Sequence, residues 1–252
     1  MDDDTDPRRH LKVDGSYNVR DLGGYETVSG RRTRWGQLLR ADSLHRLQEP
    51  AKQVLLDYGL RTVIDLRRSA ELQTLPDPFF GSDRVTYFHQ NMVGDAGLRE
   101  TAEMPDELEV AERKRQIYLF VLEERKGQVC ETLSLLALPG TLPALFHCSA
   151  GADRTGMIAA LVLGICGVPT TTIAEDYGLT ARFLINRHLD QNPDISPDEI
   201  TWQQYQRQTC PPETMLGMLA ALEERYGGVE GYLRDCRFTD SQRETIREAL
   251  VE

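Results

Sequence analysis

The 252-residue chain has no apolar run long enough for a membrane span, which needs about 20 consecutive apolar residues. Its cysteines number five, an odd count, and they are widely spaced and form no Cys-x-x-Cys pair. This argues against a disulfide framework and against a zinc site, and it favours free thiols in a reducing compartment. The first residues are acidic and lack the basic and apolar regions of a signal peptide. We therefore expect a cytoplasmic location.

Basic residues are scarce relative to acidic ones: 29 Lys and Arg stand against 40 Asp and Glu, for a net charge of −11. Nucleic-acid binding and attraction to an anionic membrane both depend on basic side chains that neutralise phosphates. We expect neither nucleic acid nor a stable membrane association. The sequence does not determine the oligomeric state.

Internal repeats and low-complexity tracts are also absent. We expect a disordered leader over residues 1–12 and a single domain over 13–252, which is long enough to bury a sizeable core. Two weakly patterned segments, 92–109 and 190–211, are predicted to be loops and candidate lids over a site.

Strand and helix patterns alternate along the first two thirds of the chain, and almost all of the rest has helical periodicity. This order predicts an α/β fold with a mostly parallel central sheet flanked by helices, followed by a helical C-terminal portion. The clearest predicted strands are 62–66, 85–89 and 142–146, and the clearest helices are 50–58, 112–124, 128–138, 157–168, 172–189, 212–226 and 240–251.

The most informative segment is 147–156, which reads His-Cys-Ser-Ala-Gly-Ala-Asp-Arg-Thr-Gly. It lies between a predicted buried strand and a predicted buried helix. A tight loop there surrounds an oxyanion with backbone N–H groups at a helix N-terminus. Cys148 lies at its base, and Arg154, six positions later, can bind two phosphate oxygens with its forked guanidinium. The pattern predicts attack on a phosphate ester by a cysteine thiolate.

A cysteine with an arginine six positions later also arises by chance, and a free cysteine is more often a small buried apolar residue. That alternative leaves Asp153 and Arg154 unexplained at the start of an apolar helix. We predict Cys148 as the nucleophile, and the phosphate-binding residues as Ser149, Ala150, Gly151, Ala152, Asp153 and Arg154.

The same surroundings predict how the nucleophile is activated. The helix N-terminus, the loop amides and Arg154 all favour the thiolate, so the pKa of Cys148 should lie below its ordinary value. His147 is expected to stiffen the loop through a hydrogen bond, with a structural core histidine as an equal alternative. Thr155 either donates its hydroxyl to the sulfur or caps the helix. No metal or cofactor is required, because Arg154 and the amides stabilise the transferring phosphoryl group.

On these residues the chain resembles the cysteine-dependent protein-tyrosine phosphatases, and more narrowly the bacterial family whose loop reads HCxxGKDRTG. Segments 18–24, 39–44, 63–67 (followed by Glu71) and 226–233 are also similar to that family. The resemblance implies hydrolysis of phosphotyrosine in proteins or peptides through a phosphocysteine intermediate, with phosphoserine and phosphothreonine as further candidate substrates. No cofactor is implied.

One position departs from the family pattern. The family has a lysine where this chain has Ala152, and that lysine lies beside the substrate phosphate and is associated with activity toward phosphoinositides. Its absence removes a positive charge from a site for a dianion. The departure weakens the expectation of phosphoinositide activity and leaves the core chemistry intact.

The leaving oxygen needs a proton from a nearby carboxylic acid. The chain lacks the Trp-Pro-Asp tripeptide that many tyrosine phosphatases use for this purpose. Asp65 matches the family's Asp-Leu-Arg segment and ends a predicted strand, and Asp153 matches the family's loop aspartate. We favour Asp65 slightly, because a carboxylate at a strand's carboxyl end faces such a site directly; its alternative role is an ion pair with Arg67 or Arg40. Asp77 is a weaker candidate.

Three alternatives to a tyrosine phosphatase stay open. A phosphatase of phosphoinositides or small metabolites would use the same loop, and a rhodanese-type sulfur transferase also uses a loop cysteine. A phosphoprotein-binding module would keep the loop without turnover. The Cys-x5-Arg-Thr pattern favours phosphoryl chemistry, and the intact Cys148, Arg154 and candidate acids favour an enzyme.

Overall fold

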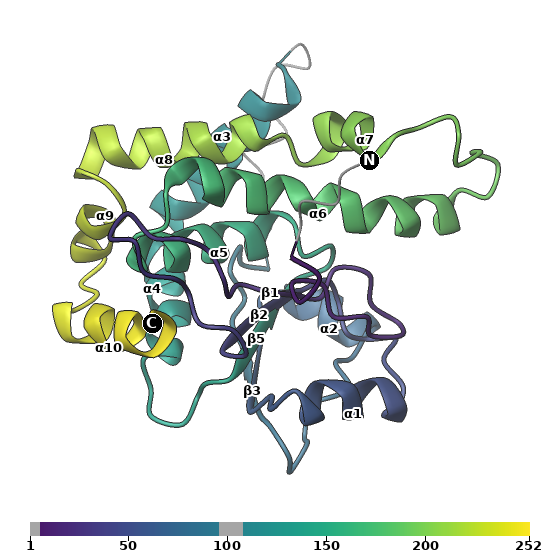
Figure 1. Cartoon of the computed structure of the whole chain (residues 1–252), viewed down its shortest axis with the longest axis horizontal. Helices are drawn as coiled ribbons and strands as arrows, with labels where there is room; N and C mark the ends of the chain where they lie inside the picture. The colour runs from purple at the N-terminus through teal and green to yellow at the C-terminus, as the bar shows by residue number, and fades with distance from the viewer. Residues whose placement is uncertain (1–5, 96–107) are drawn as a thin grey trace.

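A five-stranded sheet with the strand order β1-β2-β5-β3-β4 forms the centre of the computed structural model, which describes residues 6–95 and 108–252 (Figure 1). The central strand β5 (Ala144–His147) pairs in parallel with β2 (Leu38–Ala41) on one side and β3 (Thr62–Asp65) on the other. Strand β4 (Thr86–His89) continues the parallel sheet, and β1 (Arg20–Asp21) is antiparallel at the opposite edge. The mostly parallel sheet is as predicted.

Successive residues of each central strand point to opposite faces of the sheet and enter two separate cores. Leu38, Ile64 and Phe146 belong to the larger core, and their neighbours Leu39, Val63 and Leu145 belong to the smaller one. Every residue of these three strands is buried. Both faces of the sheet are therefore covered, as expected for an α/β fold.

Helices supply the cover. In Figure 1, α1 lies on one side of the sheet, and α5, α6 and α8 are stacked on the other. The helices are α1 (Glu49–Asp57), α2 (Ser69–Thr74), α3 (Val110–Glu124), α4 (Lys126–Leu136), α5 (Asp153–Ile165), α6 (Thr170–Gln191), α7 (Trp202–Thr209), α8 (Pro212–Tyr226), α9 (Val229–Asp235) and α10 (Asp240–Leu250). Helix α5 is apolar around most of its circumference, so it is buried almost completely between the sheet and its neighbours.

The predicted long elements are confirmed, and three short helices, α2, α7 and α9, are additional to the prediction. The expectation of a disordered leader over residues 1–12 is wrong for residues 6–12, which contact the sheet edge. Residues 1–5 lie outside the described residues. The Leu11 amide donates to Val19 O at 3.0 Å, and buried Arg9 donates to Asp21 O at 2.8 Å. These contacts tie the segment to the sheet edge, which a composition-based expectation does not detect.

The candidate lid over 190–211 is partly helical. Helix α7 begins after Thr201, whose side chain accepts from the Gln204 amide in a capping box, and it packs against α6. A lid function for this segment stays a prediction. Most of the other candidate lid, 92–109, lies outside the described residues. Within the described ranges, no helix combines the length and apolarity needed to cross a membrane.

Candidate active site

Cys148 is the first residue beyond the carboxyl end of the central strand. Its neighbour His147 is in register with Ala41 of β2 and Asp65 of β3. Helix α5 begins at Asp153, so residues 148–152 form a short loop between a buried strand and a helix N-terminus. The carboxyl edge of a parallel sheet is where such folds bind ligands, and a helix N-terminus attracts anions.

The loop carbonyls are held from the outside. Ser149 O, Ala150 O and Gly151 O all accept hydrogen bonds from groups behind the loop. The donors are the Asn18 amide (3.2 Å to Ala150 O), Arg40 Nη2 (2.7 Å to Gly151 O), the Ser43 backbone N–H (3.1 Å to Ser149 O) and Arg187 Nη1 (2.9 Å to Ser149 O). Because N–H and C=O point in opposite directions across a trans peptide, the N–H groups of Ala150, Gly151 and Ala152 point away from these donors.

Gly151 permits the turn. Its φ is +67°, and a Cβ at this position would clash with the backbone carbonyl of Ala41 at the end of β2. Only glycine combines this left-handed conformation with so close an approach of two backbones. The loop geometry therefore depends on this residue.

Replacing Gly151 with alanine should lower the free energy of unfolding by about 2 kcal/mol or more and reduce turnover, because strain and steric overlap add at one position. Gly140→Ala is the matched control: Gly140 has φ +79° and no atom within 4 Å of the added Cβ. Gly140→Ala should lower the free energy of unfolding by only about 1 kcal/mol, the cost of placing alanine at a positive φ. Denaturant unfolding of both variants is the measurement, and equal losses would contradict the overlap argument.

Cys148 is 2% exposed, and its thiol has a lowered pKa. Burial opposes the shift, but the Arg154 charge and the hydroxyl and backbone N–H of Thr155 outweigh burial and stabilise the thiolate. Cys166, at the C-cap of the same helix, is also buried, and burial raises the pKa of its thiol to about 12. The pKa values of two buried thiols at opposite ends of one helix therefore shift in opposite directions because their surroundings differ.

The Thr155 hydroxyl is buried and makes no hydrogen bond among the described residues. Thr155 lowers the pKa of Cys148, and donation of its hydroxyl to the sulfur stays a prediction. Thr155 lies inside α5, beyond the N-cap, so the alternative role as a helix cap is not realised.

Arg154 is anchored by Glu71 of α2. Arg154 Nη1 donates to Glu71 Oε2 at 2.6 Å and Nη2 donates to Oε1 at 3.1 Å, and the Ser149 hydroxyl also donates to Oε1. Although burial opposes it, these hydrogen bonds lower the pKa of Glu71. The two Arg154 contacts use two of the five N–H donors of a guanidinium. From the sequence, Glu71 was identified only as the residue that follows a segment similar to the family, because helix α2 was not predicted.

Glu71→Gln should reduce kcat about tenfold, because Arg154 and Ser149 lose a charged acceptor worth roughly 1.5–3 kcal/mol and become less well ordered. The matched control is Glu230→Gln, which breaks the Glu230–Arg247 pair (2.8 Å) between α9 and α10. Steady-state kinetics on an aryl phosphate would measure both. An unchanged kcat in Glu71→Gln would remove the positioning role.

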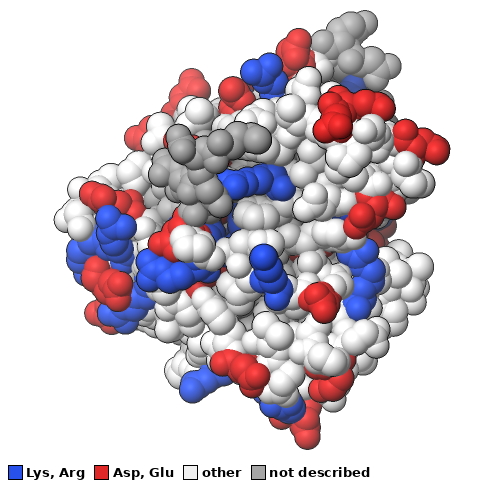
Figure 2. Space-filling view, turned by 45° about the vertical axis from the view of Figure 1, so that its right-hand side comes forward, with Lys and Arg blue, Asp and Glu red and all other residues white. Residues whose placement is uncertain are grey.

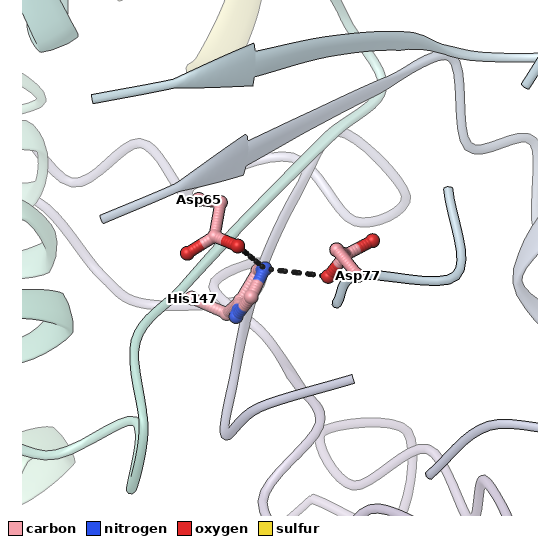
Figure 3. A group of neighbouring side chains, drawn as sticks. All are labelled: Asp65, Asp77 and His147. Atoms are coloured by element: carbon pink, nitrogen blue, oxygen red, sulfur yellow. Dashed lines mark ion pairs between the residues drawn. The ribbon is translucent and has the colours of Figure 1, made fainter. Parts of the chain in front are cut away.

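The Asp65 carboxylate lies in a buried network of ion pairs and hydrogen bonds (Figure 3). Its carboxylate accepts from Arg67 Nη2 at 2.6 Å and from the Tyr87 hydroxyl at 2.9 Å, and His147 Nε2 lies 3.6 Å away. Burial opposes the shift, but the His147 and Arg67 charges lower the pKa of Asp65. The side chain is 0% exposed. These contacts match the alternative role of Asp65, an ion pair with Arg67, and argue against the favoured role of acid.

His147 links this network to Cys148. Its Nδ1 lies 3.2 Å from the Cys148 carbonyl oxygen, and Nε2 lies 3.1 Å from Asp77 Oδ2. Burial disfavours the imidazolium, but Asp65 and Asp77 raise the pKa of His147. Asp77 therefore acts behind the loop, which argues against its weaker candidacy as the acid. His147 is therefore fully buried and contacts Cys148 O, and its role in stiffening the loop stays a prediction.

Asp65, Asp77 and His147 offer ligand atoms within 4.8 Å of one another, a spacing that can hold a metal ion. However, Arg67 Nη2 lies 2.6 Å from Asp65 and 3.9 Å from Asp77. The two carboxylates therefore already face the Arg67 guanidinium, and a divalent ion would have to displace it. The donor set fits a charge-balanced network better than a metal site.

Asp153 differs from the other two candidate acids. It is the first residue of α5, and its side chain is 46% exposed. Its Oδ1 accepts from Lys114 Nζ at 2.5 Å and from the Tyr118 hydroxyl at 2.6 Å. Burial opposes the shift, but Lys114 and Tyr118 lower the pKa of Asp153. Of the three candidates, this carboxylate alone combines a place in the loop with access to solvent.

Two buried arginines of the sheet, Arg20 in β1 and Arg40 in β2, are held by Asp176 of α6. Arg40 Nη1 lies 2.5 Å from Asp176 Oδ2, and Arg20 Nη2 donates to Asp176 O at 2.9 Å. Arg40 also donates to Gly151 O, so the charge network and the loop share one side chain. From segments 18–24 and 39–44, Asn18, Arg40 and Ser43 therefore donate to the loop carbonyls.

A family model described as "Tyrosine phosphatase family" matches residues 11–252. The chain is similar to a tyrosine-protein phosphatase of Nostoc commune, with 27% identity over 226 residues that cover 84% of this chain and 73% of the relative. It is also similar to the triple specificity protein phosphatase PtpB of Mycobacterium tuberculosis, with 26% identity over 279 residues that cover 95% of this chain and 98% of the relative.

Proposed function

The chain belongs to the tyrosine phosphatase family, and from this premise we propose that it hydrolyses phosphotyrosine in proteins through a phosphocysteine on Cys148. One observation carries the proposal. Cys148 lies at the base of a loop in which the Ser149, Ala150 and Gly151 carbonyls accept hydrogen bonds from other elements, and Arg154 and Thr155 lower the pKa of its thiol. This arrangement serves a thiolate that attacks a bound oxyanion.

In the first step, the Cys148 sulfur attacks phosphorus as the bond from phosphorus to the ester oxygen breaks. The loop N–H groups and Arg154 bind the three non-bridging oxygens, over which the charge spreads in the transition state. The departing oxygen takes a proton from Asp153. The products of this step are a phosphocysteine and the free tyrosine hydroxyl.

In the second step, water attacks the phosphocysteine. The Asp153 carboxylate, deprotonated by the first step, accepts a proton from this water, and the sulfur leaves as a thiolate. The Thr155 hydroxyl stabilises the returning charge on sulfur. Inorganic phosphate is released and Cys148 is regenerated.

Asp153, rather than Asp65, is the proposed acid. Asp65 is fully buried and accepts from Arg67 and Tyr87, so its proton could not reach a leaving group without breaking that network. Asp153 has a lowered pKa in the free enzyme, but a bound phosphate dianion beside it favours the protonated form. Substrate binding therefore favours protonation of Asp153.

The proposed substrates are phosphorylated proteins or peptides. Phosphoserine and phosphothreonine are proposed as secondary substrates, because one relative that covers nearly the whole chain is named a triple specificity phosphatase. Acidic and basic side chains are interspersed over the face in Figure 2, which fits a peptide partner better than a nucleic acid. The proposed location is the cytoplasm, which suits a catalytic thiol among five free cysteines.

The test is hydrolysis of an aryl phosphate from mildly acidic to neutral pH, with a chelator present and no added metal. Phosphotyrosine and phosphoserine peptides of one sequence then rank the substrates. We expect turnover of the aryl phosphate and a preference for the phosphotyrosine peptide. Tight binding of that peptide without hydrolysis would instead favour the phosphoprotein-binding module.

A further inference from the structure

The loop carries one basic side chain, Arg154, although a phosphate monoester brings a charge of about −1.5 to −2. The neighbouring position, at the N-cap of α5, is Ala152, which is 4% exposed and contributes no charge. A second cation beside the bound phosphate would therefore have to come from another helix or strand.

Lys114 of α3 meets this requirement. Its Nζ lies 2.5 Å from Asp153 Oδ1, and its side chain keeps 22% of its surface exposed. Burial opposes the shift, but Asp153, Cys210 and the Cys148 thiolate raise the pKa of Lys114. The ammonium group is thus charged and in contact with the proposed acid, which lies at the N-terminus of α5 directly after the loop.

We propose that Lys114 is the second cation of this phosphate site and reaches the loop from helix α3, where it binds the substrate phosphate and holds Asp153 in position. The inference rests on the proposed phosphatase function and adds a residue to it. When the dianion enters, the ammonium is shared between the phosphate and Asp153. Asp153 is then free to take up the proton that it delivers to the leaving oxygen.

The effect on pH dependence has a definite sign. A cation beside Asp153 favours the carboxylate, so its removal raises the pKa of Asp153 and keeps the acid protonated to higher pH. The groups that face this pair from the surrounding elements are Tyr118 on α3, Tyr177 on α6, Cys210 after α7, and Cys148 and Arg154 in the loop. Arg40 of β2 and Arg187 of α6 also bring positive charge to the loop, but they donate to its carbonyls Gly151 O and Ser149 O, whereas Lys114 contacts Asp153 directly.

The test replaces Lys114 with methionine, which keeps the aliphatic stem. We expect KM for an aryl phosphate to rise about tenfold, which corresponds to roughly 1.4 kcal/mol of lost phosphate binding. The alkaline, descending limb of the activity profile should move about one pH unit upward, because an adjacent opposite charge typically shifts a carboxyl pKa by about 1–3 units. Lys114→Arg should retain most of the phosphate affinity.

The chain offers a closely matched control. Lys126 Nζ also lies 2.5 Å from an aspartate, Asp235, and the exposed fractions are 25% and 51%, against 22% and 46% for Lys114 and Asp153. Lys126→Met removes the same kind of ion pair between α4 and α9. It should leave KM and the pH profile unchanged, so a purely structural cost is separated from a role in the site.

A second variant moves the charge rather than deleting it. Ala152→Lys in the Lys114→Met background puts a lysine at the N-cap of α5, next to the loop. We expect it to recover much of the lost phosphate affinity. A Lys114→Met enzyme with wild-type KM and pH profile, or a relocated lysine that recovers none of the loss, would overturn the proposal.

These outcomes are distinct from a failure of the proposed function. If wild-type protein shows no turnover, the phosphatase mechanism fails first. If wild-type protein turns over and Cys148→Ser does not, while Lys114→Met behaves as wild type, only the role of Lys114 is wrong.

Discussion

Replacing Cys148 with serine should reduce turnover of an aryl phosphate roughly 10⁴-fold or more, because it removes the nucleophile itself. A serine hydroxyl is almost entirely protonated at neutral pH, and Arg154 and Thr155 cannot lower its pKa enough to compensate. The side chain is 2% exposed and similar in size to serine, so the fold should be retained. The measurement is steady-state hydrolysis with the chelator present.

Binding should survive this substitution. The loop N–H groups and Arg154 are unchanged, so isothermal titration of a phosphotyrosine peptide should still detect a complex. Cys166→Ser is the control, because Cys166 is a buried cysteine at the other end of α5 whose pKa is raised to about 12. It should keep wild-type turnover. Undiminished activity in Cys148→Ser would remove the proposed mechanism.

Replacing Asp153 with asparagine should lower kcat about 10²- to 10⁴-fold on substrates with a poor leaving group, which is the usual contribution of a general acid. On an ester whose leaving group needs no proton, the loss should be far smaller. The alkaline limb should also flatten with the poor leaving group: in wild type, activity falls as pH rises through the pKa of Asp153, and asparagine has no proton to lose. Leaving-group series and pH profiles measure both effects.

Asp65→Asn is the natural comparison. It removes the charge partner of buried Arg67 (2.6 Å), so it should cost about 3–5 kcal/mol of stability. Any loss of turnover should be similar for good and poor leaving groups. If Asp65→Asn showed the leaving-group dependence and Asp153→Asn did not, Asp65 would be the general acid and the proposed role of Asp153 would be wrong.

The loop was predictable because its chemistry is local. Cys148, Gly151 and Arg154 lie within seven residues, and the apolar segments on both sides require a buried strand and a buried helix. The parallel sheet followed from the same alternation of patterns. Contiguous residues with one function leave a pattern that a single sequence reveals.

The supporting residues were harder to predict because tertiary contacts decide their roles. Asp65 and Asp153 are the same residue type near the same loop, and their burial and their partners, Arg67 and Lys114, distinguish them. Glu71 reaches Arg154 across 83 positions of sequence, from a short helix without strong periodicity. Its partner is set by the fold and leaves no mark in local spacing.

Acid quenching during turnover, followed by mass spectrometry of the peptide that contains Cys148, tests the central claim most directly. The substrate should be an aryl phosphate with a good leaving group, so that formation of the intermediate is fast. The account predicts a phosphoryl group on Cys148 during turnover and none on Cys166. Sustained turnover with no phosphoryl group on Cys148, or with one on another residue, would contradict it.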